Sequence, residues 1–161
     1  MSRAYDANFM AYADQSSRYA AQQVATLLRG PLALGSVLDI GCARGTWLQA
    51  WSALGAADVQ GVDGDYVDRA TLQIPAEHFR AHDLSQPLDL GRRFDLVQSL
   101  EVAEHVPAAA AEIFVDNLCR HSSGYVLFSA APPGQGGEFH INEQPYDYWR
   151  ERFRARGYVA H

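Results

Sequence analysis

Length, composition and charge limit what this chain can be. Its 161 residues, 48% hydrophobic and 20% charged, suffice for one globular domain with a hydrophobic core. A net charge of −6 argues against a nucleic-acid surface that depends on overall positive charge, and favours a small-molecule partner. With two cysteines, no visible signal peptide and no apolar span, we expect a protein of the reducing cytoplasm without a membrane partner.

Helical and strand-like apolar segments alternate along the chain. In chain order we predict a helix from Ser16 or Ser17 to Leu28, a strand over 37–40, a helix over 46–54, a strand over 59–62, a short helix over 65–70, strands over 78–82 and 94–100, a helix over 107–118, a strand over 125–128 and a helix over 145–156. This alternation predicts an α/β fold with a doubly wound, mostly parallel Rossmann-like sheet in three α/β/α layers. Ligand loops then lie at the carboxyl ends of the strands.

The glycine spacing after the first predicted strand indicates the ligand class. Asp39 stands near the end of this strand, Gly41 and Gly45 follow in the turn, and Asp63 comes at the end of the next apolar run. A dinucleotide-binding turn needs two further glycines, but Ala43 and Thr46 stand at those positions. A P-loop is excluded because the chain contains no lysine. Two acidic strand ends beside a glycine turn suit an adenosine-type cofactor that carries positive charge.

These features resemble the class I S-adenosylmethionine-dependent methyltransferases, and the resemblance extends over nearly the whole chain. The matching segments are 39–45, Asp63, 82–84, 94–106 and 128–145, of which the last resembles a bacterial subgroup often placed in secondary-metabolite or glycan pathways. The resemblance implies S-adenosylmethionine as cofactor, S-adenosylhomocysteine as product, and methyl transfer to an oxygen or nitrogen of a small molecule. We expect one domain over 1–161, with a helical lid over 1–30 and a Rossmann-like core over 34–161.

Ten residues are candidates for the cofactor site: Asp39, Gly41, Cys42, Gly45, Asp63, Gly64, Asp83, Leu84, Leu100 and Glu101. Asp63 is expected to accept hydrogen bonds from both ribose hydroxyls, or else to cap the following helix. Asp39 lies beneath the methionine portion or stabilises the turn. Asp83 contacts the adenine amino group or begins an Asx turn. Leu100 offers its backbone carbonyl to the cofactor ammonium, and Cys42 offers only its backbone.

Some neighbouring residues have two interpretations. Tyr66 and Trp47 line the cofactor pocket or belong to the core. Tyr12 and Arg18 are candidates for binding the cofactor carboxylate. The arginines at positions 150, 152, 154 and 156 are interpreted as a solvated helix face.

Two histidines in loops at the ligand side are candidates for a catalytic base. His140 lies in a glycine-rich loop that can act as a lid, and His105 follows the strand over 94–100. Asn142 and Gln144 are candidates for binding polar groups of the acceptor. His105 can instead bond Glu101. A metal site built from the histidines with Asp or Glu has little support from their spacing, so no metal is expected.

Members of the resembled family usually continue into two more strands, which form an antiparallel hairpin at the sheet edge. Here the sequence ends at His161, so we expect the complete hairpin to be missing and the strand edge to be exposed, which makes a homodimer plausible. Two rival functions remain: a cofactor-binding partner subunit without catalysis, and a nucleotide-cofactor oxidoreductase.

Overall fold

A five-stranded, entirely parallel sheet forms the centre of the molecule in the computed structural model, which describes residues 7–161, with side chains from Ser17 onward. The strand order is β3-β2-β1-β4-β5. The strands are β1 (Ser36–Ile40), β2 (Asp58–Asp63), β3 (Phe79–Ala81), β4 (Phe94–Leu100) and β5 (Ser122–Ser129), and the α-helices are α1 (Ala7–Arg29), α2 (Thr46–Ala53), α3 (Ala111–His121) and α4 (Tyr146–Arg154). The predicted Rossmann-like fold is confirmed.

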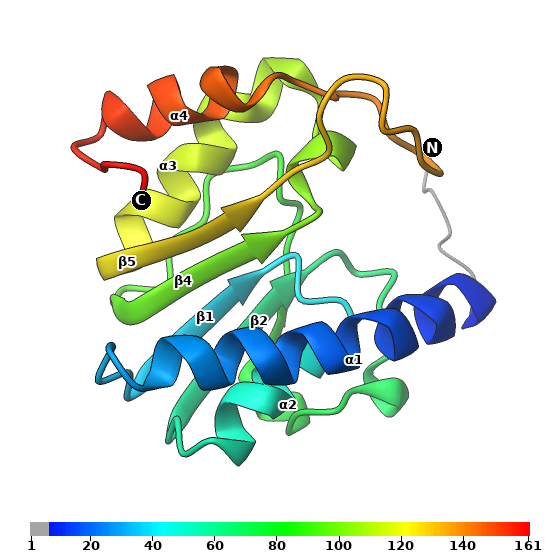
Figure 1. The fold of residues 1–161 in the computed structure, drawn as a ribbon. Helices are drawn as coiled ribbons and strands as arrows, with labels where there is room; N and C mark the ends of the chain where they lie inside the picture. Colours follow the sequence, from blue (N-terminus) through cyan, green and yellow to red (C-terminus); the bar gives the residue numbers. More distant parts are fainter. Residues whose placement is uncertain (1–6) are drawn as a thin grey trace.

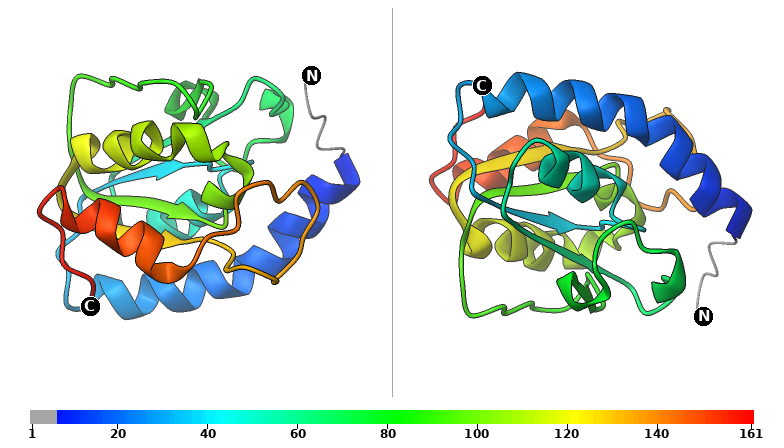
Figure 2. Two further views of the ribbon diagram at one scale, coloured as in Figure 1. Left: turned by 90° about the horizontal axis from the view of Figure 1, so that it is seen from above. Right: turned by 90° about the horizontal axis from the view of Figure 1, so that it is seen from below.

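Helices cover both faces of the sheet, with α1 and α2 on one side and α3 and α4 on the other (Figures 1 and 2). The α1–α2 side buries Ala25, Leu48 and Trp51 against Val37 and Leu96 of the sheet. The opposite side buries apolar residues of α3 and the aromatic face of α4, among them Phe114, Val115, Leu118 and Trp149. Removing this apolar surface from water stabilises the three layers.

The parallel register brings the carboxyl ends of β1, β2 and β4 together. Asp39 lies opposite Gly61 on one side and Gln98 on the other, and Asp63 lies opposite Ala81. In Figure 1 the strand arrows point toward the end of the sheet over which the loop between β5 and α4 passes. Every loop that carries a predicted site residue therefore leaves the sheet at the carboxyl ends of its strands.

Three predicted element boundaries are wrong. Helix α1 begins at Ala7, because nothing between Ala7 and Arg29 interrupts an alanine-rich segment and Ser16 and Ser17 lie inside it. The expected helix over 65–70 is instead a turn followed by a 3₁₀ turn, Arg69–Thr71, where the Asp68 side chain accepts from Ala70 N–H. Pro107 precedes a 3₁₀ turn, Ala108–Ala110, before α3 begins.

The arginines in α4 and in the turn directly after it do not form one solvated face, which corrects that interpretation. Arg156 donates to Asp116 Oδ1 at 2.6 Å and to Glu112 Oε2 at 2.9 Å, and Arg152 pairs with Glu112 Oε1 at 2.9 Å. Both arginines therefore attach α4 to α3, while Arg150 and Arg154 are exposed. The docked α4 fixes the end of the loop that carries His140.

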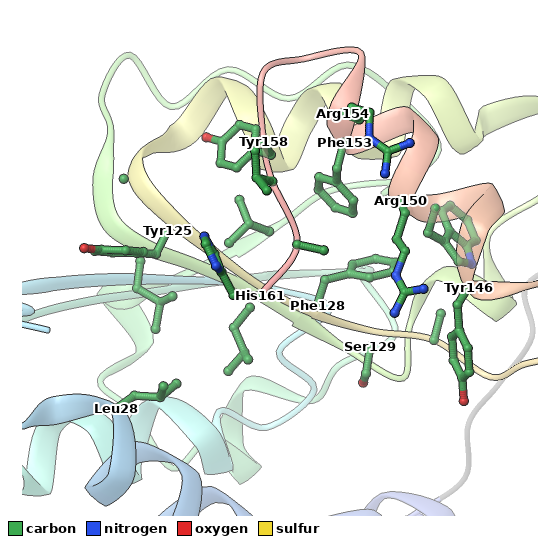
Figure 3. A pocket seen from close by; sticks show the side chains of 18 of the residues that line it. Leu28, Tyr125, Phe128, Ser129, Tyr146, Arg150, Phe153, Arg154, Tyr158 and His161 are labelled. Atoms are coloured by element: carbon green, nitrogen blue, oxygen red, sulfur yellow. The ribbon is translucent and has the colours of Figure 1, made fainter. Parts of the chain in front are cut away.

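The outer edge of β5 is open in residues 7–161, where β4 is its only strand partner and no antiparallel strand follows. A groove of about 1000 Å³ runs along this edge between the end of α1 and α4 (Figure 3). Leu28, Tyr125, Phe128 and Arg150 are among its lining residues. None of the helices in this part of the chain is both long and apolar enough to span a bilayer.

Candidate active site

A tight turn from Gly41 to Gly45 joins β1 to α2. The backbone N–H groups of Gly41 and Cys42 both donate to Val62 O, at 2.8 and 3.2 Å, which binds the turn to the end of β2. Gly41 has φ of +91°, and a Cβ there would lie 2.4 Å from Val102 Cγ2. Glycine is therefore required by both conformation and space. The turn therefore lies close beside the two acidic strand ends.

Asp63 is buried at the end of β2 with three donors on its carboxylate. Ala43 N–H donates to Oδ2 at 2.7 Å, Gly64 N–H donates to Oδ1 at 2.7 Å, and the Tyr66 hydroxyl also donates to Oδ1. Burial raises the pKa of Asp63, and these three hydrogen bonds oppose the rise. Its carboxylate connects the glycine turn with the segment after β2, and the Tyr66 ring lies against Gly64. It does not cap a helix over 65–70.

Asp39 is buried beside Asp63 and belongs to a chain of side-chain hydrogen bonds. Trp51 Nε1 donates to Gln98 Oε1 at 2.8 Å, and Gln98 Nε2 donates to Asp39 Oδ2 at 2.8 Å. Burial raises the pKa of Asp39 to about 7; the Gln98 hydrogen bond opposes the rise and the charge of Asp63 adds to it. Two buried carboxylates that repel one another suit a ligand with positive charge.

The Cys42 thiol points into the protein. Its Sγ atom packs closely against Gly61, where an added Cβ would lie only 2.6 Å from the sulfur. Burial raises the pKa of the thiol well above its ordinary value. A protonated, buried thiol is a poor nucleophile, so only the backbone of Cys42 is available to a ligand.

Asp83 forms the Asx turn that the sequence allowed. Its Oδ1 accepts from Ser85 N–H at 2.9 Å and from Ser85 Oγ at 2.7 Å, and these bonds lower the pKa of Asp83. The carboxylate is exposed after β3, and Leu84 behind it packs against the core. A contact of Asp83 with adenine remains a prediction.

Leu100 and Glu101 lie at the carboxyl end of β4, which is the same end of the sheet as Asp39 and Asp63. Glu101 has φ of +55°, and its N–H lies 3.2 Å from both Ser129 O and Ser129 Oγ of β5. Its exposed carboxylate accepts from Gln135 Nε2 at 3.3 Å. Glu101 thus connects the end of β4 with the loop after β5, and it is also one of the residues that line the groove along β5.

His140 is held by Glu143. The Nδ1 atom of His140 lies 2.8 Å from Glu143 Oε1, and 13% of the side chain is exposed. The ring of His105 packs edge-on against the His140 ring, with 4.9 Å between the ring centres. The structure therefore brings the two predicted histidines together, although 35 positions separate them in the sequence.

Glu104 lies beneath these histidines and was not predicted. Its side chain is fully buried, and Oε1 lies 4.0 Å from His140 Nε2. Burial raises the pKa of Glu104 to about 7. Ligand atoms of Glu104, His105 and His140 all lie within 4.8 Å of one another, close enough to hold a cation. The expectation of no metal remains a prediction.

The two predicted acceptor contacts differ in exposure. Asn142 is buried, its N–H donates to Glu104 O at 3.0 Å, and its side-chain oxygen accepts from Gln144 Nε2 at 2.9 Å. Asn142 therefore supports the loop, and Gln144 is the more accessible of the pair. Arg18 donates to Gln73 Oε1 at 3.4 Å near the start of α2. The side chain of Tyr12 lies outside the described residues.

Sequence reasoning missed Gln98, Trp51, Glu104 and Glu143. The alternation of β4 places Gln98 on the same face as Leu96, so a polar residue in a buried strand was the available signal. Glu143 stands three positions after His140, but in an irregular loop this spacing does not predict contact.

Comparison with known proteins finds matches to methyltransferases. Residues 12–159 match the family described as a methyltransferase domain. The chain is 30% identical over 122 residues to a ubiquinone biosynthesis O-methyltransferase of Neisseria meningitidis, covering 70% of this chain and 46% of the relative. A protein with the same description from a Methylobacterium species is 34% identical over 107 residues, covering 63% and 42%.

Solved structures share the fold at low identity. The magnesium protoporphyrin IX methyltransferase of Synechocystis, solved with bound S-adenosylmethionine, superposes with a TM-score of 0.71 at 21% identity, covering 98% of this chain and 78% of that chain. The chain spans less than half the length of the two curated relatives, so activity and substrates do not transfer with the match.

Proposed function

The chain belongs to the methyltransferase-domain family, and on this premise we propose that it transfers the methyl group of S-adenosylmethionine to an oxygen or nitrogen of a small molecule. The observation that carries the proposal is the pair of buried carboxylates, Asp39 and Asp63, on either side of the Gly41–Gly45 turn. Solved proteins of this fold that carry bound S-adenosylmethionine or S-adenosylhomocysteine support the choice of cofactor.

The residues at the turn fit such a cofactor. When bound, S-adenosylmethionine supplies a methyl group on a positively charged sulfur. Asp63 accepts hydrogen bonds from the ribose hydroxyls, and Asp39 compensates positive charge at the methionine end. The missing Cβ atoms at Gly41 and Gly45 make room for the side chains of Val102 and Ile74, which lets the turn stay tight beside the two carboxylates. Leu100 and Glu101 border the methionine end, while Gly64, Asp83 and Leu84 border the adenine.

Three of the acceptor positions on the Asp63 carboxylate are already occupied, so one of the two ribose hydroxyls has to displace one of the present donors. A carboxylate offers about four acceptor positions, and Ala43, Gly64 and Tyr66 fill three of them. The two backbone donors, Ala43 in the glycine turn and Gly64 directly after β2, are fixed by the fold and stay. Tyr66 is 40% exposed, so its side chain has room to turn away, and its hydroxyl gives its place to a ribose hydroxyl when the cofactor binds.

His140 removes the acceptor proton in this proposal. Methyl transfer is an in-line displacement, so positioning supplies much of the acceleration, and a base adds about 10²–10⁴-fold for a hydroxyl acceptor. His140 lies in the loop after β5, and its Nδ1 atom is hydrogen-bonded to Glu143. Gln144, in the same loop, is placed to bind polar groups of the methyl acceptor. His105 supports the His140 ring through their edge-on contact.

Two experiments test the function in sequence. A thermal-shift and calorimetric titration with S-adenosylhomocysteine tests the pocket, and nicotinamide cofactors should not bind. An acceptor screen with labelled S-adenosylmethionine, over hydroxylated natural products, sugars and amines, then tests the chemistry. His140→Ala should lower turnover about 10²-fold or more with little change in cofactor affinity, and a chelator should change neither. Cofactor binding without transfer to any acceptor would favour a non-catalytic subunit.

The association state and location are also proposals. The open edge of β5 and the groove beside it are consistent with a homodimer that pairs at this edge. The acidic net charge supports the absence of a nucleic-acid partner, and the reduced Cys42 and Cys119 are consistent with a cytoplasmic protein. Light scattering of the purified chain over a concentration series tests the dimer.

A further inference from the structure

One carboxylate organises the loop between β5 and α4. Glu143 Oε2 accepts from Gly134 N–H at 2.8 Å, and Oε1 accepts from Gly136 N–H at 2.8 Å and faces His140 Nδ1 at the same distance. Gly134 and Gly136 both have positive φ, of +86° and +69°, so the loop folds back on itself where these bonds form. The same group therefore holds the loop and the imidazole.

The space for the imidazole is provided by a further glycine. A Cβ on Gly137 would lie 2.3 Å from His140 Nε2, so only glycine at this position admits the ring in its observed place. Phe139, directly before His140, has φ of +64°, a conformation that costs a bulky residue about 1–2 kcal/mol. The bonds to Glu143 and the backbone bonds of Ile141 and Asn142 to Glu104 O offset this cost.

A hydrogen bond at one ring nitrogen decides which tautomer a neutral imidazole adopts. An ionised carboxylate can only accept, so the Nδ1 atom facing Glu143 must carry the proton. Hydrogen bonds from His140, Gly134 and Gly136 lower the pKa of Glu143, which keeps the carboxylate ionised. The lone pair then lies on Nε2, the atom available to take a proton.

We propose that Glu143 is a positioning residue that couples closure of the glycine-rich loop to the orientation and tautomer of His140. The inference rests on the proposed role of His140 as the base. Glu143 reaches the imidazole only through a loop whose two glycine N–H groups it also binds, so an open loop leaves the base without its partner. Among the side chains that the structure describes, from Ser17 onward, the other charged or titratable groups that face the imidazole are Glu104 and His105, both from the segment after β4.

The direct test is the tautomer of His140, read from its two ring nitrogens by long-range ¹H–¹⁵N correlation spectra of ¹⁵N-histidine-labelled protein. The signals are assigned with His140→Gln and measured at a pH where the ring is neutral. The wild type should show a protonated Nδ1 and an unprotonated Nε2. Glu143→Ala should shift the ring toward the Nε2–H form, and amide exchange of Gly134 and Gly136 should rise about tenfold or more.

Two matched variants separate orientation from loop closure. Glu143→Gln retains a side-chain oxygen for Nδ1–H and Gly136 N–H but turns an NH₂ toward Gly134, so the tautomer should persist while Gly134 exchange accelerates. Glu138→Ala removes an exposed acid of the same loop and should change neither reading.

An Nε2–H tautomer in the wild type, or a Glu143→Ala protein with unchanged tautomer and exchange, would overturn the inference. If Glu143→Ala does not fold, the wild-type tautomer and the Glu143→Gln exchange decide. These readings need neither cofactor nor acceptor, so they stand or fall separately from the proposed activity.

Discussion

Replacing Asp39 with asparagine should change how the stability of this protein depends on pH. The pKa of Asp39 rises from 3.8 to about 7, so the folded protein keeps a proton that the unfolded chain releases. Its contribution to stability is therefore fully present below pH 3.8 and is lost as the pH rises through about 7. Between pH 5 and pH 7 this loss amounts to about 2 kcal/mol, because the slope is about 1.4 kcal/mol for each pH unit and declines as the folded group begins to ionise near pH 7.

Asparagine removes this titration and leaves the hydrogen bond from Gln98 Nε2, which its side-chain oxygen can accept. We expect Asp39→Asn to lose less stability than the wild type between pH 5 and pH 8, by about 3 kcal/mol. Glu104, whose pKa also rises to about 7, retains its own share of the slope in both proteins.

Urea unfolding followed by circular dichroism at several pH values measures this difference. Asp65→Asn, an exposed residue near the site, is the matched control and should follow the wild type. Parallel stability curves for the wild type and Asp39→Asn would refute the assignment of a raised pKa to Asp39, and with it the argument that the site favours a cationic ligand.

Two further substitutions test how the site opens and how its loop is anchored. Tyr66→Phe removes the hydroxyl that occupies Asp63, so S-adenosylhomocysteine should bind about three- to tenfold tighter by calorimetry, and weaker binding would mean that the hydroxyl helps to hold the ligand. Arg156→Ala should lower the free energy of unfolding by about 1–2 kcal/mol, because Arg156 joins α4 to Glu112 and Asp116 and is largely shielded from water; equal loss in the exposed control Arg154→Ala would show that these ion pairs contribute little.

The fold was predictable because its signals are local. Apolar strands with Asp39 and Asp63 at or near their ends, and helices between them, predict a parallel sheet, and sheets of this kind generally bind ligands at their carboxyl ends. The start of α1 was less predictable, since Ser16 and Ser17 are good capping residues yet lie inside a continuous helix.

The contacts around the candidate site were harder to predict than the fold. The pairing of His140 with Glu143, and the approach of Glu104 from a segment some 36 positions earlier, depend on how an irregular loop folds back over the sheet edge. The series of side-chain hydrogen bonds from Trp51 through Gln98 to Asp39 joins a helix to two strands. Such tertiary contacts leave no periodic pattern in the sequence.

The central claim is that the acidic strand ends beside the glycine turn bind an adenosyl cofactor. Calorimetric titration of S-adenosylhomocysteine into the wild type and into Asp63→Ala tests it most directly, with near-ultraviolet circular dichroism to confirm that both are folded. We predict saturable one-to-one binding to the wild type and affinity at least tenfold lower for Asp63→Ala, the loss expected for about 1.5–3 kcal/mol in each charge-assisted hydrogen bond. Equal affinity in the two folded proteins, or no binding to the wild type, would contradict the claim.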